Sequence, residues 1–196
     1  MKMFSSIRKH MFFIFLSTSI LLSEKYNIDI KESKVYWVGR KISGEHHGII
    51  NIKNGYIDIV KNSIIGGEII IDMESIEVLD MSEKYNQKLG AHLKNLDFFD
   101  VDKFPEASFE IKQTYDFLMI DNIAFEGELT IKDKSIISFI PAMVSINNNQ
   151  AEAIGVVNIN RTLFGITYGS GTFFEDLADR AIDDEFTLKF KIVARK

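Results

Sequence analysis

The sequence predicts an all-β fold with short helical interruptions, in the form of an antiparallel sandwich or barrel. From Tyr26 onward, β-branched and aromatic runs are separated by Gly, Asn and Lys turn signals. Two later runs alternate apolar and polar residues, which is typical of strands with one buried face. The runs recur at roughly 8–12-residue spacing, and no linker divides the chain. We therefore expect one domain, residues 24–196.

Residues 1–23 have the features of a secretory signal peptide. Three basic residues among the first ten are followed by a predominantly apolar run at 11–22, and the first acidic residue is Glu24. This apolar run is too short for a membrane-spanning helix, which needs about 20 residues. An uncleaved anchor is the alternative. We expect export with cleavage near residue 23 and no stable membrane insertion of the remaining chain.

The first strands are expected at 35–38, 48–52, 56–60 and 67–73, where β-branched and aromatic residues cluster. Asn54-Gly55 stands between two of these runs, and this dipeptide favours a tight hairpin turn. The sequence therefore predicts a hairpin at Asn54-Gly55.

The later strands carry the clearest alternation. Apolar positions on one face are Phe125, Leu129 and Ile131 in the first run, and Phe186, Leu188, Phe190 and Ile192 in the second. Glu, Thr and Lys occupy the positions between them. One face of each strand is therefore expected to contact water. Residues 147–149, all Asn, are expected at a loop tip.

Two segments have helix-like patterns. Leu89, Leu93 and Leu96 recur at helical spacing within 82–95, behind Ser82 as a plausible N-cap. Residues 173–178 could form a turn and a half of helix. We expect both segments to cover a barrel end as lids.

Charge and cysteine content limit the function classes. The formal net charge is −5, and without residues 1–23 there are 20 Lys and Arg against 28 Asp and Glu, a charge of −8. Such an acidic surface argues against nucleic acid as a partner. The absence of Cys excludes disulfides, thiol chemistry and a lipid-modified cysteine. We expect a periplasmic or secreted protein held together by its core alone.

Motifs for catalysis are nearly absent, so we predict no enzyme and no cofactor. Ser170 lies in Tyr168–Gly171, which lacks the spacing of a nucleophile elbow and is interpreted as a turn. Gly66-Gly67 lacks the Lys-Ser/Thr of a phosphate loop. The acidic stretch at 176–185 does not follow calcium-loop spacing and is interpreted as a solvated face.

His46, His47 and His92 are the candidates for a metal site or for acid–base chemistry. Adjacent histidines on a strand point to opposite faces, so His46 and His47 cannot both reach one ion without a bulge. We therefore expect no metal. An acid–base role would require one histidine inside a cavity beside a carboxylate.

Three ordered motifs carry a resemblance to a known family. The first pairs His92–Val101 with the strand entry Lys103–Phe109, the second is Gly127–Lys132, and the third is Asn160–Phe174 running into Leu177–Phe186. In this order they resemble the signature of the YceI-like family. The resemblance covers most of residues 26–193.

The resemblance implies an eight-stranded, lipocalin-like antiparallel β-barrel that holds an isoprenoid or other lipid in an apolar tunnel. The aromatic and aliphatic residues expected to line that tunnel, and otherwise to be plain core, are Trp37, Phe109, Phe125, Leu129, Phe139, Phe164, Phe186 and Phe190. His47 and Arg161 could donate to the polar head of the lipid. Arg161 could instead pair with Asp179, Asp183 or Asp184.

A barrel of about eight strands is either filled by side chains or holds one small ligand. The expected function is therefore carriage or sequestration of a lipid without catalysis, and a homodimer is possible. The alternatives are an enzyme or enzyme accessory acting on a hydrophobic substrate, and a filled barrel that acts through its surface as a structural or stress protein. Cavity volume decides between an open and a filled barrel.

Overall fold

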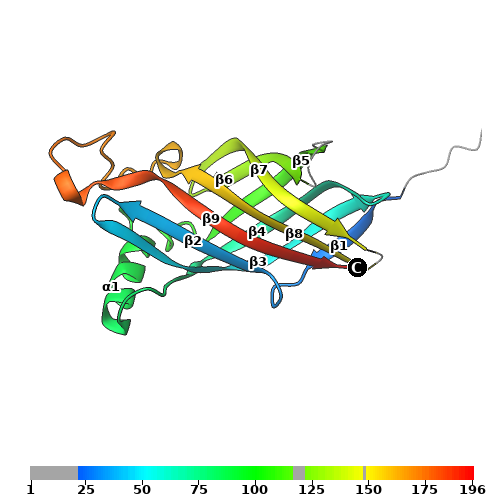
Figure 1. Cartoon of the computed structure of the whole chain (residues 1–196), viewed down its shortest axis with the longest axis horizontal. Helices are drawn as coiled ribbons and strands as arrows, with labels where there is room; N and C mark the ends of the chain where they lie inside the picture. Colours follow the sequence, from blue (N-terminus) through cyan, green and yellow to red (C-terminus); the bar gives the residue numbers. More distant parts are fainter. Residues whose placement is uncertain (1–21, 117–121, 148) are drawn as a thin grey trace, which may run out of the picture.

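Strands account for most of the chain, as the alternating runs predict. The structure is a computed structural model, and it describes residues 22–116, 122–147 and 149–196 (Figure 1). The strands are β1 (Glu24–Ile28), β2 (Lys34–Lys41), β3 (Gly44–Val60), β4 (Ser63–Val78), β5 (Glu106–Asp116), β6 (Asn122–Ile131), β7 (Lys134–Ile146), β8 (Gln150–Asn160) and β9 (Ile182–Arg195). The helices are α1 (Glu83–Lys94) and the short 3₁₀ turns η1 (Arg161–Phe164) and η2 (Ala178–Arg180).

These strands close into an antiparallel barrel with eight strand positions. The order β3-β2-β9-β8-β7-β6-β5-β4 is completed by pairing of β3 with β4. The short strand β1 adds no ninth position: Tyr26 lies opposite Ile57 of β3, and Ile28 lies opposite Ala194 of β9. β1 therefore continues the line of β2 between the same two neighbours. The prediction of an eight-stranded antiparallel, lipocalin-like barrel is confirmed.

The alternation in the sequence translates into an inner and an outer face. On β6, Phe125, Leu129 and Ile131 are buried, whereas Glu126 and Glu128 reach the surface. On β9, Ile192 is buried, but Phe186 and its neighbours at 188 and 190 are only partly buried. These inward side chains face an internal space instead of close-packed neighbours.

The predicted helix at 82–95 is confirmed as α1, with Ser82 at its N-cap position. The Ser82 side chain makes no capping hydrogen bond, but its carbonyl accepts from the Asn86 N–H at 2.9 Å. α1 packs against β4, and Gly90 is the helix residue that is buried there. Figure 1 shows α1 at the barrel end that also carries the β2–β3 hairpin, opposite the C-terminus.

The second predicted helix, at 173–178, is wrong. Phe173 and Phe174 lie in a turn whose N–H groups donate to the Ser170 carbonyl, and both rings are at least half exposed. Asp176 then has a φ of 60°, in the left-handed region, which interrupts any right-handed helix. Only the 3₁₀ turn η2 follows, beginning at Ala178.

The predicted hairpin at Asn54-Gly55 is also wrong. β3 runs through this dipeptide with a register shift between Ile52 and Asn54. The chain reverses instead at Lys61 and Asn62, whose φ angles of 49° and 63° suit a two-residue hairpin. Gly55 serves close packing, because a Cβ there would lie 2.5 Å from the Glu68 carbonyl oxygen.

The predicted signal peptide lies outside the described residues, except for its last two positions. Within the described ranges, no helix has the length and apolar character that crossing a membrane requires. The predicted loop tip at 147–149 joins β7 to β8, and the Asn147 N–H donates to the Gln150 carbonyl there at 2.8 Å. Residue 148 itself is outside the described ranges.

Candidate functional site

A cavity of about 350 Å³ lies inside the barrel. Each of the strands β2 to β9 contributes inward side chains to its wall, and Leu89 and Leu93 of α1 reach it from one end. The volume falls within the range of about 300–1,000 Å³ that is usual for small-molecule sites. The barrel is therefore not completely filled by its own side chains.

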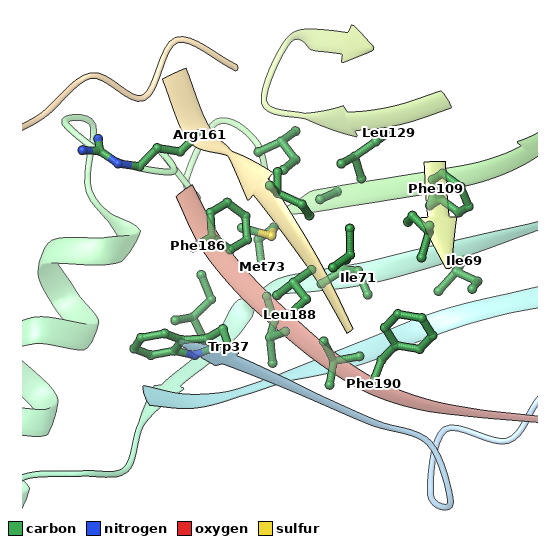
Figure 2. Close-up of a pocket in the computed structure, with 18 of the residues that line it drawn as sticks. Trp37, Ile69, Ile71, Met73, Phe109, Leu129, Arg161, Phe186, Leu188 and Phe190 are labelled. Atoms are coloured by element: carbon green, nitrogen blue, oxygen red, sulfur yellow. The ribbon is translucent and has the colours of Figure 1, made fainter. Parts of the chain in front are cut away.

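The wall of the cavity is almost entirely apolar because it is built from the inner faces of strands. β9 contributes Phe186, Leu188 and Phe190 at alternate positions. Trp37 of β2 closes one side, and its indole N–H donates to the Ile49 carbonyl at 3.2 Å, so that its one polar atom is satisfied. Figure 2 shows these side chains gathered around the same internal space.

Six of the eight residues predicted for the tunnel do line this cavity: Trp37, Phe109, Phe125, Leu129, Phe186 and Phe190. The prediction is wrong for Phe139, whose side chain lies outside the barrel with 58% of its surface exposed. The neighbouring Ile140 takes the inward position on β7. It is also wrong for Phe164, which is fully buried in η1 as core and is not part of the cavity wall.

The sequence-based prediction of tunnel residues, which was based mainly on aromatic side chains, did not include the aliphatic wall residues of β4. Ile69, Ile71 and Met73 line the cavity, as Figure 2 shows. They stand at alternate positions of the predicted strand 67–73, so period-2 spacing was the signal that could have found them. Ile70 and Asp72, between them, cannot face the same side.

His46 and Asp80 form a hydrogen-bonded pair beside the cavity. His46 belongs to the cavity wall, and its Nδ1 lies 2.8 Å from Asp80 Oδ2. Burial raises the pKa of Asp80, but hydrogen bonds from the His46 ring and from the His47 amide outweigh this, so the pKa lies below its ordinary value. The pair places a polar, partly buried group at an otherwise apolar wall.

The prediction that His47 faces a ligand is wrong. His47 is exposed and is not part of the cavity wall, whereas the adjacent His46 is. Their opposite orientations follow from the strand geometry, as expected. His92 of α1 also lines the cavity, and its ring lies edge-on to Tyr168 with 4.6 Å between centroids.

Arg161 is used to hold the loop between β8 and β9. It is 2% exposed, and its guanidinium donates to four backbone carbonyls, those of Ile166, Tyr168, Ile182 and Asp183, at 2.8–3.0 Å. Its Nη2 also lies 3.5 Å from Asp184 Oδ1. Four of its five N–H groups are thus committed to the backbone. The structural alternative, pairing with Asp184, describes Arg161 better than donation to a ligand.

Arg161 lies at the edge of the cavity wall, and Figure 2 shows its side chain extending away from the apolar cluster. Burial lowers the pKa of Arg161, while the carboxylates of Asp184 and Asp183 oppose that effect. Among the residues that the structure describes, no three His, Asp or Glu side chains gather closely enough to hold a metal ion. The chemistry available at the cavity is therefore apolar burial with a few polar groups at its edge.

Solved structures with the same fold come from several bacteria. BcnA of Burkholderia cenocepacia is 24% identical with a TM-score of 0.68, over 85% of this chain and 99% of BcnA. A polyisoprenoid binding domain from Saccharophagus degradans is 10% identical with a TM-score of 0.63, over 87% of this chain and 97% of that domain. The YCEI protein of Campylobacter jejuni is 19% identical with a TM-score of 0.52, over 68% of this chain and 74% of that protein.

No curated protein gives a significant match to the sequence. The model of the YceI-like domain, in contrast, matches residues 26–194, which is nearly the whole of the described barrel. The match covers the strand that holds Trp37, the helix α1 and the closing strand β9. The chain belongs to the YceI-like family.

Proposed function

We propose that this protein is exported and holds an isoprenoid or other long-chain lipid inside its barrel, for carriage or sequestration without chemical change. The observation that carries the proposal is the cavity of about 350 Å³ with an apolar wall drawn from all eight strand positions. A fold with the same topology in Saccharophagus degradans is described as a polyisoprenoid binding domain. The predicted signal peptide at 1–23 supports export.

Burial of the apolar chain would supply most of the binding energy. Transfer of each CH₂ group from water to such a wall contributes about 0.8 kcal/mol. The apolar chain of the lipid would contact Leu129 on one side and Phe186 with Leu188 on the other. A site of this kind selects a lipid by the length and flexibility of its apolar chain more than by its polar head group.

The polar end of the ligand would lie near α1. Arg40 and His46 of the β2–β3 hairpin and Glu185 at the start of β9 belong to the cavity wall there. His46 replaces His47 in this role, and Arg161 is left out because its N–H groups already bind the backbone. A few polar groups of this kind are enough to orient a lipid.

The test begins with native mass spectrometry of protein purified without detergent, followed by solvent extraction and lipid analysis. A stoichiometric apolar adduct is the expected result. Trp37 is the only tryptophan of the chain and lies in the cavity wall, so its fluorescence reports on the cavity directly. A brominated fatty acid should quench it with a saturable 1:1 curve. A bare mass together with unquenched Trp37 would rule out lipid binding.

One observation favours a second candidate, acid–base catalysis on a hydrophobic substrate. His46 lines the cavity and is hydrogen-bonded to the Asp80 carboxylate, the arrangement that such a role requires. The extracted lipid decides between the two candidates. Recovery of a lipid unchanged after prolonged incubation supports carriage, whereas a new product that is lost in His46→Gln supports catalysis.

A further inference from the structure

The seam between β7 and β8 has fewer paired residues than the contact between any other two neighbouring strands among β2 to β9. β7 and β8 pair through only four residue pairs, from Met143 with Ile154 to Ile146 with Ala151. β7 nevertheless continues to pair with β6 as far as Lys134, and β8 continues to pair with β9 as far as Asn160. Continuing the register, the β7 stretch 137–142 and the β8 stretch 155–160 therefore face each other without a ladder.

The residues where the ladder stops explain why it stops. Pro141 has no N–H to donate, so it cannot continue the hydrogen-bond pattern beyond the last pair, Met143 with Ile154. On β8, Gly155 directly follows the last paired residue, Ile154, and has no Cβ. The Phe190 ring of β9 packs against it, in the space that a Cβ would need, beside the Pro141 carbonyl. An aromatic side chain that lines the cavity thus lies directly under the start of the unpaired seam.

The outer face on both sides of this seam is mostly apolar, with Asn158 as a polar exception on β8. Ile137, Phe139 and Met143 of β7 are 56–58% exposed, and Ile154 and Val156 of β8 are 41% and 54% exposed. The outward positions of the neighbouring strands carry charge instead: Glu126 and Glu128 on β6, Lys189 and Lys191 on β9. Exposed apolar groups gathered on two adjacent strands indicate contact with an apolar partner.

The same two strands carry apolar side chains into the cavity. Ile140 of β7 and Val157 of β8 both line it, and continuing the β7–β8 register would set them opposite each other. Apolar side chains therefore lie on both the outer and the inner side of the seam, and no charged residue lies in 137–142 or 155–160. The wall near α1, in contrast, includes the charged residues Arg40, Asp183 and Glu185.

We propose that the β7–β8 seam is a lateral entrance through which the apolar chain of the ligand passes between the outside and the cavity. This inference rests on the proposed lipid binding. The chain crosses sideways between the two unpaired strand segments, with the Phe190 ring moving aside, while the polar head stays near α1. An apolar chain that took the end route would have to pass charged side chains, and along the seam it meets none.

The test locks the seam with a reversible covalent bond in a chain that has no natural cysteine. In Phe139→Cys/Asn158→Cys, continuing the register places the two sulfurs on opposite sides of the unpaired segment. The control is Thr130→Cys/Ser135→Cys, which joins β6 to β7 where the ladder is already formed and where the two hydroxyl oxygens lie 2.7 Å apart. Where air oxidation does not form the disulfide, a short bis-methanethiosulfonate cross-linker joins the two thiols through disulfides by displacing methanesulfinate, and reduction also removes it.

The probe is cis-parinaric acid delivered from phosphatidylcholine vesicles, followed by energy transfer from Trp37 in a stopped-flow instrument. We expect locking of the seam to slow loading and release at least tenfold with little change in Kd, and reduction to restore both rates. The control pair should load at the same rate oxidised and reduced. Equal rates for the locked and reduced seam would overturn the entrance. Absence of binding in every form, the wild type included, would instead overturn the proposed function.

A second variant tests the outer face without any cross-link. Phe139→Lys/Val156→Lys places two charges at the mouth of the seam and leaves the cavity wall unchanged. We expect slower loading at unchanged Kd. The alternative is that a second copy of the protein covers this outer face, and analytical ultracentrifugation tests it. If the wild type is a dimer that this variant converts to a monomer, and the loading rates do not change, the face is a self-association surface and the entrance is excluded.

Discussion

The ring of Phe190 on β9 occupies the space next to Gly155 on β8, its paired residue. A Cβ at Gly155 would collide both with this ring and with the carbonyl oxygen of Pro141 on β7. A single glycine thus sets how an aromatic residue of the cavity wall packs across three strands. The contact joins the shape of the cavity to the seam between β7 and β8.

Gly155→Ala should therefore push the Phe190 ring into the cavity. Overpacking of this kind costs about 1–3 kcal/mol of unfolding free energy, and we also expect weaker quenching of Trp37 by a brominated lipid. Urea denaturation and lipid titration measure the two effects. Gly171→Ala is the matched control, because no atom lies within 4 Å of a Cβ there. Equal stability of the two variants would contradict the packing role of Gly155.

Arg161→Gln should destabilise the barrel strongly. The guanidinium binds the carbonyls of Ile166 and Ile182 among others, and its removal leaves buried carbonyl acceptors without their donor and takes the cation away from Asp184. Loss of such a buried group costs about 3–5 kcal/mol, which urea denaturation would detect. The control is Arg180→Gln, at an exposed position. A loss of lipid affinity with unchanged stability would show that Arg161 serves the ligand after all.

Acid should weaken the fold through Asp80. Its folded-state pKa lies below the ordinary 3.8 because hydrogen bonds from His46 and the His47 amide outweigh the effect of burial. The unfolded chain therefore binds the proton more readily than the folded chain. The stability from this pair is complete above about pH 3.8 and is lost as the pH falls through the lowered pKa.

Asp80→Asn should accordingly reduce the loss of stability between pH 6 and pH 3, measured as the change in urea midpoint. Asp133→Asn is the control, because Asp133 is exposed in the β6–β7 turn. An identical acid response of the wild type and Asp80→Asn would contradict the role of the His46–Asp80 pair.

Leu129→Arg should abolish lipid binding. Leu129 is 8% exposed and lines the cavity, so an arginine would bring an unpaired charge into an apolar space, which costs several kcal/mol and excludes the apolar chain. The matched control, Glu128→Arg, changes the neighbouring outward position of β6 and should bind normally. Binding is measured by quenching of Trp37, and folding by circular dichroism. Normal binding by a folded Leu129→Arg would exclude this cavity as the site.

Local pattern was enough to predict the strands with one polar face and the helix α1. Phe125, Leu129 and Ile131 alternate with charged residues, so only one orientation of β6 buries its apolar side. The leucines of 82–95 recur with helical spacing behind Ser82, and α1 begins at Glu83. The ordered motifs that resemble the YceI-like family were likewise present in the sequence, and the family match confirms them.

Tertiary structure decided which face is inward in strands where adjacent residues are similar in character, and it decided the volume of the cavity. β7 carries Phe139 and Ile140 side by side, and β3 carries His46 next to His47, so a one-residue change of register would exchange their faces. Only pairing around the closed barrel turns Ile140 and His46 inward. Cavity volume likewise depends on how side chains from eight strand positions meet, which no local pattern contains. The incomplete β7–β8 ladder has the same origin: Pro141 is visible in the sequence, but the strand that it faces is set by closure of the barrel.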